Sequence, residues 1–228
     1  MLWYIIYSGL FRTRDVRAVI AIIDYEAGNL TSVARAVDYL GASCAVTQDL
    51  GVIAGAERVI FPGVGAAGSA MASLKRLGLD QALADALASG RPVLGICLGT
   101  QIVFQESQED LAKCLGFLPG QVVRFPLSHI DNAGEPLKVP HMGWNGVSWK
   151  TSHPVFADLP EQAEYYFVHS FYPAPADQAT VLGVTEYGLE FASAVGRDNL
   201  VAVQFHPEKS GAPGLKILEN FLAWDGKV

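Results

Sequence analysis

The first half of the chain alternates short apolar runs with segments of helical periodicity, and this alternation restricts the fold more than any other feature. Residues 18–23 are continuously apolar and rich in β-branched side chains, which is typical of a strand buried on both faces of a parallel sheet. Residues 30–40 then carry apolar side chains at helical spacing, and Gly41 ends the pattern. The alternation continues with expected strands at residues 43–47, 58–61 and 92–96, and with helical segments at 66–90, broken near Gly78, and at 100–109.

The second half has a different pattern, in which short strand-like runs are separated by turns rich in Pro, Gly, Asn and Asp. These runs are expected strands at residues 122–125, 147–149, 165–168, 181–185, 192–195 and 200–205. An amphipathic helix is expected at residues 215–224. The sequence therefore predicts an α/β fold with a mostly parallel open sheet flanked by helices and with antiparallel strands added at one edge.

The length of 228 residues suits one large domain, which we place at residues 18–228. Residues 1–17 are expected to form an N-terminal extension, and we interpret it as a tail; a surface strand or an upstream start codon would also explain it. Its apolar stretch at residues 1–10 is too short to span a bilayer. A signal peptide would carry its basic residues before the apolar part, whereas Arg12, Arg14 and Arg17 follow it.

Charge and cysteine content argue against several classes of protein. The formal net charge is -7 and Lys and Arg form no cluster, which disfavours nucleic acid as a partner. Cys44, Cys97 and Cys114 are too few for a disulfide framework, and they fit a cytoplasmic chain whose thiols stay reduced. No two His or Cys residues have the spacing of metal ligands, so neither a metal nor a cofactor is expected.

The sequence around Cys97 predicts a nucleophile. Gly95 and Gly99 lie two residues to either side of it, between an expected buried strand and an expected helix. A strand–turn–helix elbow of this kind presents a nucleophile, and its tight turn leaves no room for side chains at those two positions. A helix N-terminus favours the thiolate, and the N–H of Leu98 can bind an oxyanion. A structural core cysteine is the alternative, and we adopt it for the other two cysteines.

His206 and Glu208 are the candidates for the base and its orienting carboxylate. They follow an expected strand, and side chains at positions i and i+2 of a strand lie on one face. A carboxylate beside one imidazole nitrogen fixes the tautomer and leaves the other nitrogen to take the proton of a thiol. Alone, the pair is better explained as a polar strand end at the surface. Together with the elbow, it predicts a triad of Cys97, His206 and Glu208.

The chain resembles the class I, triad-type glutamine amidotransferases in three motifs, which occur in the order of that family. The motifs are Pro62-Gly63-Val64-Gly65, residues 95–101, and His206-Pro207-Glu208. Within the class, four segments resemble the glutaminase subunits of imidazole glycerol phosphate synthase, an enzyme of histidine biosynthesis. They are residues 23–30, 140–145, 166–171 and 206–210, and the whole resemblance covers roughly residues 18–228. Glu26, Thr100 and Gln105 depart from the usual pattern, and none of them is a catalytic group.

The resemblance implies a flavodoxin-like fold and a role for each matched residue. Cys97 attacks the amide of glutamine, His206 transfers the proton, and Glu208 orients His206. The N–H groups of Val64 and Leu98 form the oxyanion hole.

The resemblance also implies how glutamine is held and how the site is switched on. Five residues are expected to bind the amino-acid end of glutamine: Gly65, Gln101, Glu109, Ser170 and Phe171. Gln101 lies one helical turn beyond Cys97, which fits this role, whereas Glu109 lies far down the expected helix. Gly63 and Gly65 leave their segment free to reorient a peptide, which would serve as an activation switch.

A partner follows from the same resemblance. Ammonia released from glutamine would pass to the cyclase subunit of a heterodimer, a (β/α)8 barrel that makes imidazole glycerol phosphate and an aminoimidazole carboxamide ribotide. Trp144 and Lys209 are expected at the interface with that subunit. In a monomeric enzyme, a tryptophan folded onto the core from a loop and a solvated lysine would be the simpler explanation.

Three other functions fit parts of the sequence. Another class I amidotransferase subunit would serve a different synthase, and a stand-alone thiol hydrolase of the same fold would be fully active without a partner. A catalytically dead scaffolding subunit is disfavoured by the intact triad. Co-purification with a cyclase, and a glutaminase assay with and without it, separate these functions.

Overall fold

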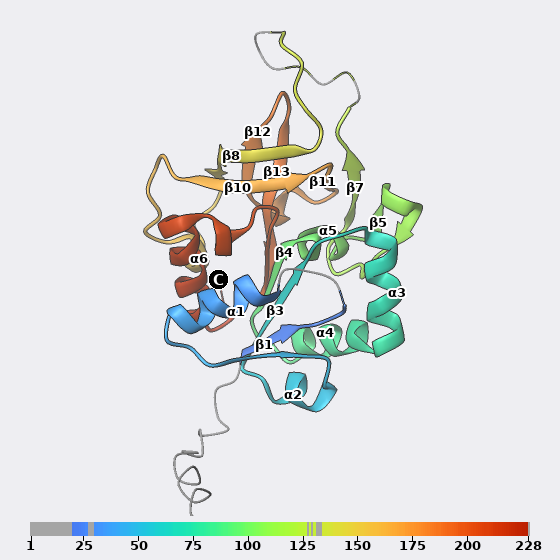
Figure 1. Ribbon diagram of the computed structural model, residues 1–228, viewed down its shortest axis with the longest axis vertical. Coiled ribbons are helices and arrows are strands. Elements are labelled where there is room, and N and C mark those ends of the chain that lie inside the picture. The colour runs from blue at the N-terminus through green and yellow to red at the C-terminus, as the bar shows by residue number, and fades with distance from the viewer. Residues whose placement is uncertain (1–19, 27–29, 127, 129, 131–133, 228) are drawn as a thin grey trace, which may run out of the picture.

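The computed structural model describes residues 20–26, 30–126, 128, 130 and 134–227. The expected N-terminal extension at residues 1–17, and the first two residues of the expected strand at 18–23, lie outside them. Figure 1 shows a central sheet with helices on both faces and smaller strand pairs toward one end. Within the described ranges, no helix is long and apolar enough to cross a lipid bilayer.

Among the described residues, eight strands form the main sheet. They are β1 (Ile20–Ile23), β2 (Cys44–Thr47), β3 (Arg58–Gly63), β4 (Val93–Cys97), β9 (Ser148–Trp149), β12 (Val181–Glu186), β13 (Glu190–Arg197) and β14 (Leu200–Val203). Their spatial order is β2-β1-β3-β4-β14-β13-β12-β9. The first five strands in that order pair in parallel, and the last three are added by antiparallel pairing. The predicted sheet is confirmed, including the antiparallel strands at one edge.

Helices cover both faces of this sheet. They are α1 (Leu30–Tyr39), α2 (Leu50–Gly55), α3 (Ala67–Leu77), α4 (Leu79–Ala88), α5 (Leu98–Ile102) and α6 (Gly211–Ala223). In β1, Ile20 and Ile22 pack in the buried cluster that includes α1 and α6, whereas Ala21 and Ile23 pack in the cluster that includes α3 and α4. Both faces of the strand are therefore buried, which explains its continuously apolar sequence.

The ends of the helices were predicted correctly at some positions and wrongly at others. Gly78 adopts φ 70° between α3 and α4, as the predicted break requires. The sequence analysis missed α2, whose N-terminus is capped by the Asp49 carboxylate. The expected helix at residues 100–109 is wrong beyond its first turn, because α5 ends at Ile102. The carbonyl groups of residues 102–104 accept hydrogen bonds from N–H groups within residues 115–118, not from the helix itself.

Two smaller sheets complete the fold. One pairs β8 (His141–Gly146) with β10 (Glu164–His169), and the other contains β5 (Glu106–Ser107), β6 (Ala112–Lys113), β7 (Gly120–Arg124) and β11 (Phe171–Pro175). Short 3-10 turns lie at Glu109–Leu111, Pro154–Phe156, Gln178–Thr180 and Pro207–Lys209. The expectation of a loop around Trp144 is wrong, since this residue lies within β8. Figure 1 shows the pair of β8 and β10 above α6.

Candidate active site

Cys97 is the last residue of β4 and stands directly before α5, as the predicted elbow requires. Its backbone adopts φ 54° and ψ -105°, a conformation that costs a non-glycine residue energy and recurs at functional sites. A Cβ added to Gly95 would lie 2.9 Å from the Cβ of Ala202, and one added to Gly99 would overlap the carbonyl oxygen of Phe61. The two glycines therefore permit the close backbone packing that holds the elbow.

His206 and Glu208 lie beside this elbow and contact each other. The Nδ1 atom of His206 lies 2.8 Å from Oε1 of Glu208, and both side chains are almost fully buried. The predicted contact is present, but its predicted cause is wrong. β14 ends at Val203, and the two residues belong to the tight turn at Pro207–Lys209 and its N-cap, so they do not share the face of a strand.

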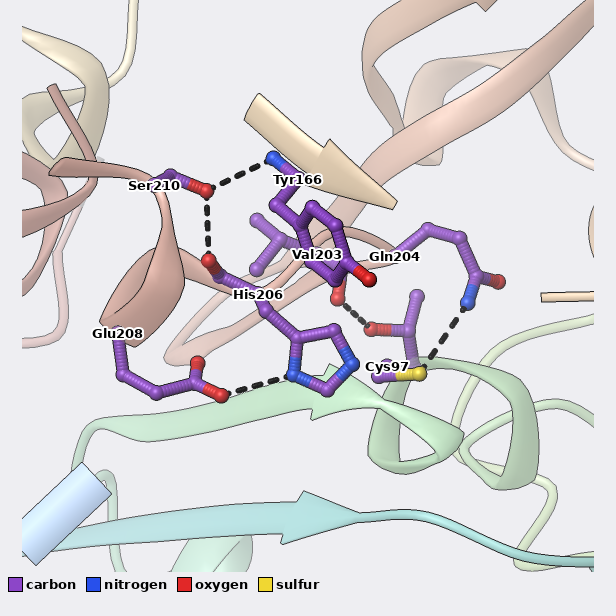
Figure 2. Close-up of polar contacts among 8 residues, drawn as sticks. Cys97, Tyr166, Val203, Gln204, His206, Glu208 and Ser210 are labelled. Carbon is purple, nitrogen blue, oxygen red and sulfur yellow. Dashed lines mark hydrogen bonds and ion pairs between the residues drawn. The ribbon is translucent and has the colours of Figure 1, made fainter. Parts of the chain in front are cut away.

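The second ring nitrogen of His206 is directed toward Cys97. Figure 2 shows Nε2 on the side of the ring that faces the sulfur. This nitrogen is buried and forms no hydrogen bond of normal geometry with any described residue. Burial lowers the pKa of His206, but its interactions with Cys97 and with Glu208 outweigh burial and raise the pKa to about 9. At neutral pH the ring is therefore protonated, and it places a positive charge beside the sulfur.

A second set of hydrogen bonds fixes the backbone on which His206 stands. The hydroxyl of Ser210 donates to the carbonyl oxygen of His206 at 2.6 Å and accepts from the N–H of Tyr166 at 3.0 Å. The N–H of His206 donates to the carbonyl of Tyr166 at 2.9 Å. The turn at residues 207–209 is thus tied to β10, and Figure 2 shows the two contacts of Ser210 beside the triad.

Gln101 and Gln204 line the other side of the nucleophile. The amide nitrogen of Gln101 donates to the carbonyl of Phe171 at 2.9 Å and to Oε1 of Gln204 at 3.1 Å. The amide nitrogen of Gln204 lies 3.8 Å from the sulfur of Cys97. The sequence analysis missed Gln204, although it stands two residues before the predicted base and is fully buried. The signal available in the sequence was an amide side chain at the end of an apolar run, directly before the His206 motif.

The segment that should supply the oxyanion hole directly follows β3. Gly65 adopts φ 105°, and Val64 and Gly65 are exposed at the surface. A Cβ on Gly63 would overlap the hydroxyl of Tyr25, so only glycine fits beneath this segment. Among the described residues, the Tyr25 hydroxyl has no hydrogen-bond partner. Burial and the neighbouring Cys97 raise its pKa well above the ordinary value.

Glu109 lies close to the segment of Val64 and Gly65, although it does not stand on the helix that the sequence predicted. It lies in the 3-10 turn Glu109–Leu111, not on a long helix. Its Oε2 atom accepts a hydrogen bond of 2.9 Å from the N–H of Ala67, at the start of α3 and two residues after Gly65. Burial raises the pKa of Glu109, and the bond from Ala67 opposes that rise. Ser170 lies between β10 and β11, and Phe171 is the first residue of β11, with its carbonyl held by Gln101.

Trp144 and Lys209 both contact the ring of Tyr166, which in turn lies beside His206. Trp144 is 53% exposed and packs edge-on against the ring of Tyr166, with 6.1 Å between ring centroids. The ammonium of Lys209 lies 5.9 Å above the same ring. Met142, on the same face of β8, is also exposed. We call these four residues the outer aromatic face; Tyr166, its central residue, was missed by the sequence analysis.

The remaining cysteines differ from Cys97. All three are free thiols. Burial raises the pKa of Cys114 to about 11 and also raises the pKa of Cys44, so neither is prone to form a thiolate. In the part of the chain that the structure describes, no group of three His, Cys, Asp or Glu side chains is arranged to hold a metal ion.

Comparison with known proteins identifies the family. The family model of class-I glutamine amidotransferases matches residues 21–224, so the chain belongs to that family. Within it, the chain belongs with the imidazole glycerol phosphate synthase subunits called HisH. It is 50% identical over 206 residues to HisH of Nitratidesulfovibrio vulgaris (strain Miyazaki F), covering 90% of this chain and 97% of that protein. HisH 1 of Pseudomonas aeruginosa is 49% identical over 210 residues, covering 91% of this chain and 98% of that protein. The predicted resemblance is confirmed.

Solved structures agree on the fold. PurLQS from Thermotoga maritima superposes with a TM-score of 0.68 at 18% identity, covering 91% of this chain and 98% of that one. A glutamine amidotransferase from Thermotoga maritima gives a TM-score of 0.57 at 21% identity, covering 89% of this chain and 80% of that one. At such low identity these likenesses show the fold alone.

Proposed function

We propose that this chain hydrolyses glutamine to glutamate and ammonia, with Cys97 as nucleophile, His206 as acid and base, and Glu208 as orienting group. The observation that carries the proposal is the buried contact of His206 with Glu208 on one side of the ring while the other nitrogen faces Cys97 at the elbow. Membership of the class-I glutamine amidotransferases supports glutamine as the substrate.

The geometry supports the following sequence of bond changes. The sulfur of Cys97 attacks the side-chain amide carbon of glutamine, and His206 Nε2 gives its proton to the departing nitrogen, so that ammonia leaves and a thioester remains. Neutral Nε2 then takes a proton from water, whose oxygen attacks the thioester carbon. When the C–S bond breaks, glutamate departs and the sulfur leaves as a thiolate. Nε2 keeps the proton taken from water, so the starting pair of Cys97 thiolate and protonated His206 is restored. Throughout, the hydrogen bond from Nδ1 to Glu208 keeps one tautomer in place.

We propose contacts for both ends of the glutamine molecule, the side-chain amide and the amino-acid end. The N–H groups of Val64 and Leu98 stabilise the oxyanion, and Gly65, Glu109, Ser170 and Phe171 surround the amino-acid end. Gln101 also contacts the amino-acid end, through its side-chain oxygen alone. Both N–H groups of its amide are occupied by Phe171 and Gln204, so only Oε1 is available, and this atom accepts from the α-ammonium of glutamine.

We further propose that the ammonia passes to a cyclase subunit in a heterodimer, which forms imidazole glycerol phosphate and an aminoimidazole carboxamide ribotide. The names of the HisH relatives support this assignment. The outer aromatic face, with Trp144 and Lys209, is the proposed contact surface, since it lies next to the triad and exposes apolar side chains. We infer a cytoplasmic location, supported by three free thiols, and one amidotransferase domain at residues 18–228 after a tail at 1–17.

The test is a Cys97→Ala variant. It should lose glutamine hydrolysis by about 10⁴-fold or more, because no thioester forms. Its fold should be retained, since alanine fits where the thiol stood. In complex with the cyclase, the variant should still support product formation from an added ammonium salt. A Cys44→Ala variant is the matched control and should behave like the wild type. Hydrolysis that persists in Cys97→Ala would sink the assignment.

A further inference from the structure

A continuous series of polar contacts joins β8 to the nucleophile. It has six steps: Asn145 Nδ2 to His141 Nε2 at 3.4 Å, His141 Nδ1 to His169 Nε2 at 3.1 Å, His169 Nδ1 to the Phe171 carbonyl at 2.8 Å, that carbonyl to Gln101 Nε2 at 2.9 Å, Gln101 Nε2 to Gln204 Oε1 at 3.1 Å, and Gln204 Nε2 to Cys97 Sγ at 3.8 Å. His141 and His169 are not members of the proposed triad.

The chemistry of each atom fixes the direction of these bonds. A carbonyl oxygen only accepts, so Nδ1 of His169 must carry the proton that it donates to Phe171. Burial lowers the pKa of His169 to about 3, so its ring is neutral near pH 7 and its Nε2 accepts. The Nδ1 atom of His141 must then be the donor. Each ring is held in one orientation and His169 in one tautomer.

The same reasoning fixes the amides nearer the nucleophile. The Phe171 carbonyl has two lone pairs, and His169 and Gln101 occupy both. The amide of Gln101 uses both of its N–H groups, so a flip would leave Phe171 and Gln204 facing an oxygen. Gln204 in turn accepts from Gln101 and directs its own amide nitrogen toward the sulfur of Cys97.

The surroundings of the two histidines do not require polar side chains. The ring of His141 stacks on Tyr187 at 3.9 Å and on Phe167 at 4.8 Å between centroids, and that of His169 lies 5.2 Å from Phe191. Apolar side chains would fill such a site without the cost of burying polar atoms, and replacing a buried polar network in this way is often neutral or stabilising. The presence of a complete polar network here therefore points to a requirement of the reaction.

We propose that His169, supported by His141, is a positioning residue for glutamine hydrolysis: it holds the Phe171 carbonyl, and through it Gln101 and Gln204, in the one arrangement that serves both substrate and nucleophile. The inference rests on the proposed glutaminase function. The two ring nitrogens of His169 bond to His141 and to the Phe171 carbonyl, so this residue acts through others. The outer end of the series lies on β8, the strand whose opposite face carries Trp144.

The test compares three variants of the full chain in complex with the cyclase. His169→Phe removes both polar atoms, and its kcat/KM for glutamine should fall by about 10- to 100-fold, with kcat reduced as well as KM raised, since small displacements of aligned groups carry costs of this order. His169→Gln restores one donor and one acceptor and should recover most of the activity. His153→Phe is the matched control, because His153 is another buried, neutral histidine packed on aromatic rings outside the network.

A spectroscopic measurement keeps the proposal testable if His169→Phe fails to fold. Nitrogen-15 NMR of the wild type should show His169 as the neutral Nδ1–H tautomer at pH 6–8. The Nε2–H tautomer, or equal activity in all three variants, would overturn the proposal. Failure of the glutaminase function itself is recognised separately, because Cys97→Ala would then retain hydrolysis while the tautomer of His169 stays as described.

Discussion

The elbow around Cys97 and the outer aromatic face are neighbouring regions of one site that are held by different forces. The elbow is buried, and its shape follows from backbone packing around Gly95 and Gly99, where no Cβ fits. The outer aromatic face is exposed, and Trp144 and Lys209 both contact the ring of Tyr166.

This difference separates two kinds of functional residue. In the elbow, position is dictated by sterics and by satisfied buried hydrogen bonds, so a small change disturbs fold and chemistry together. On the outer face, a side chain can be removed at little cost to the fold, because solvent already covers it. Substitutions in the first region should therefore act on the enzyme itself, and substitutions in the second should act on association.

The largest effect is expected for Gly99→Ala. The added methyl group would overlap the carbonyl oxygen of Phe61, which belongs to the backbone of β3 and cannot turn aside. We expect destabilisation of about 4 kcal/mol or more and loss of glutaminase activity. Gly55→Ala is the matched control, since a Cβ there meets open space. Urea unfolding and a glutaminase assay measure both, and a stable, active Gly99→Ala protein would contradict the steric explanation of the elbow.

The next effect concerns the oxyanion segment Val64-Gly65, which directly follows β3 and is exposed. If a peptide at Val64 must turn inward for catalysis, the free subunit should bind glutamine but hydrolyse it about 10²- to 10³-fold more slowly than the complex with cyclase and ribotide. The flexibility of Gly65 and the exposure of Val64 favour such a rotation. Steady-state rates with and without the partner measure the factor. A free subunit that already runs at the full coupled rate rules out the switch.

A smaller effect is expected on the outer aromatic face. Trp144→Ala and Lys209→Ala should each weaken the complex by about 2 kcal/mol, roughly 30-fold in Kd, with little change in the unfolding of the subunit. Lys216→Ala, at a partly exposed position on α6, is the control for charge. Titration calorimetry measures Kd, and the ratio of glutamate to cyclase product measures coupling. If both variants bind normally and keep that ratio near one, the contact surface lies elsewhere.

The same division explains what the sequence could predict. The buried strands and the elbow were predictable, because apolar runs and paired glycines report local constraints. The contact of His206 with Glu208 was predicted for the wrong reason, since the end of β14 depends on tertiary hydrogen bonds. The helix at α5 was predicted too long for the same cause, because the carbonyl groups of residues 102–104 accept hydrogen bonds from residues 115–118 instead of continuing the helix.

Residues whose contacts lie far away in the sequence were the hardest to predict from the sequence. Gln204 reaches Cys97 across more than a hundred positions of sequence, and Tyr166 meets Trp144 only because β8 and β10 pair in one register. β8 itself was taken for a loop, because its glycines and asparagine hide the alternation of buried and exposed residues. Such pairings arise from the assembled sheet and have no local pattern to reveal them.

A pH dependence of the unfolding free energy is expected from the buried His206. The pKa of His206 is about 9 in the folded chain and about 6.5 when unfolded, so the folded state holds the extra proton between these values. The stabilisation is complete below about pH 6.5 and is lost as the pH rises through about 9, with a slope of at most about 1.4 kcal/mol per pH unit. Cys114, whose pKa rises from 9.0 in the unfolded chain to about 11 in the folded one, adds its own loss from about pH 9 upward, so the part of the decline that belongs to His206 is read below that pH. Urea unfolding at pH 6.5, 7.5, 8.5 and 9.5 should show the decline in the wild type, and His206→Gln should flatten it. Trp144→Ala, on the exposed side, should leave the slope unchanged; a wild-type stability that is level across this range would mean that His206 is not charged beside Cys97 and Glu208.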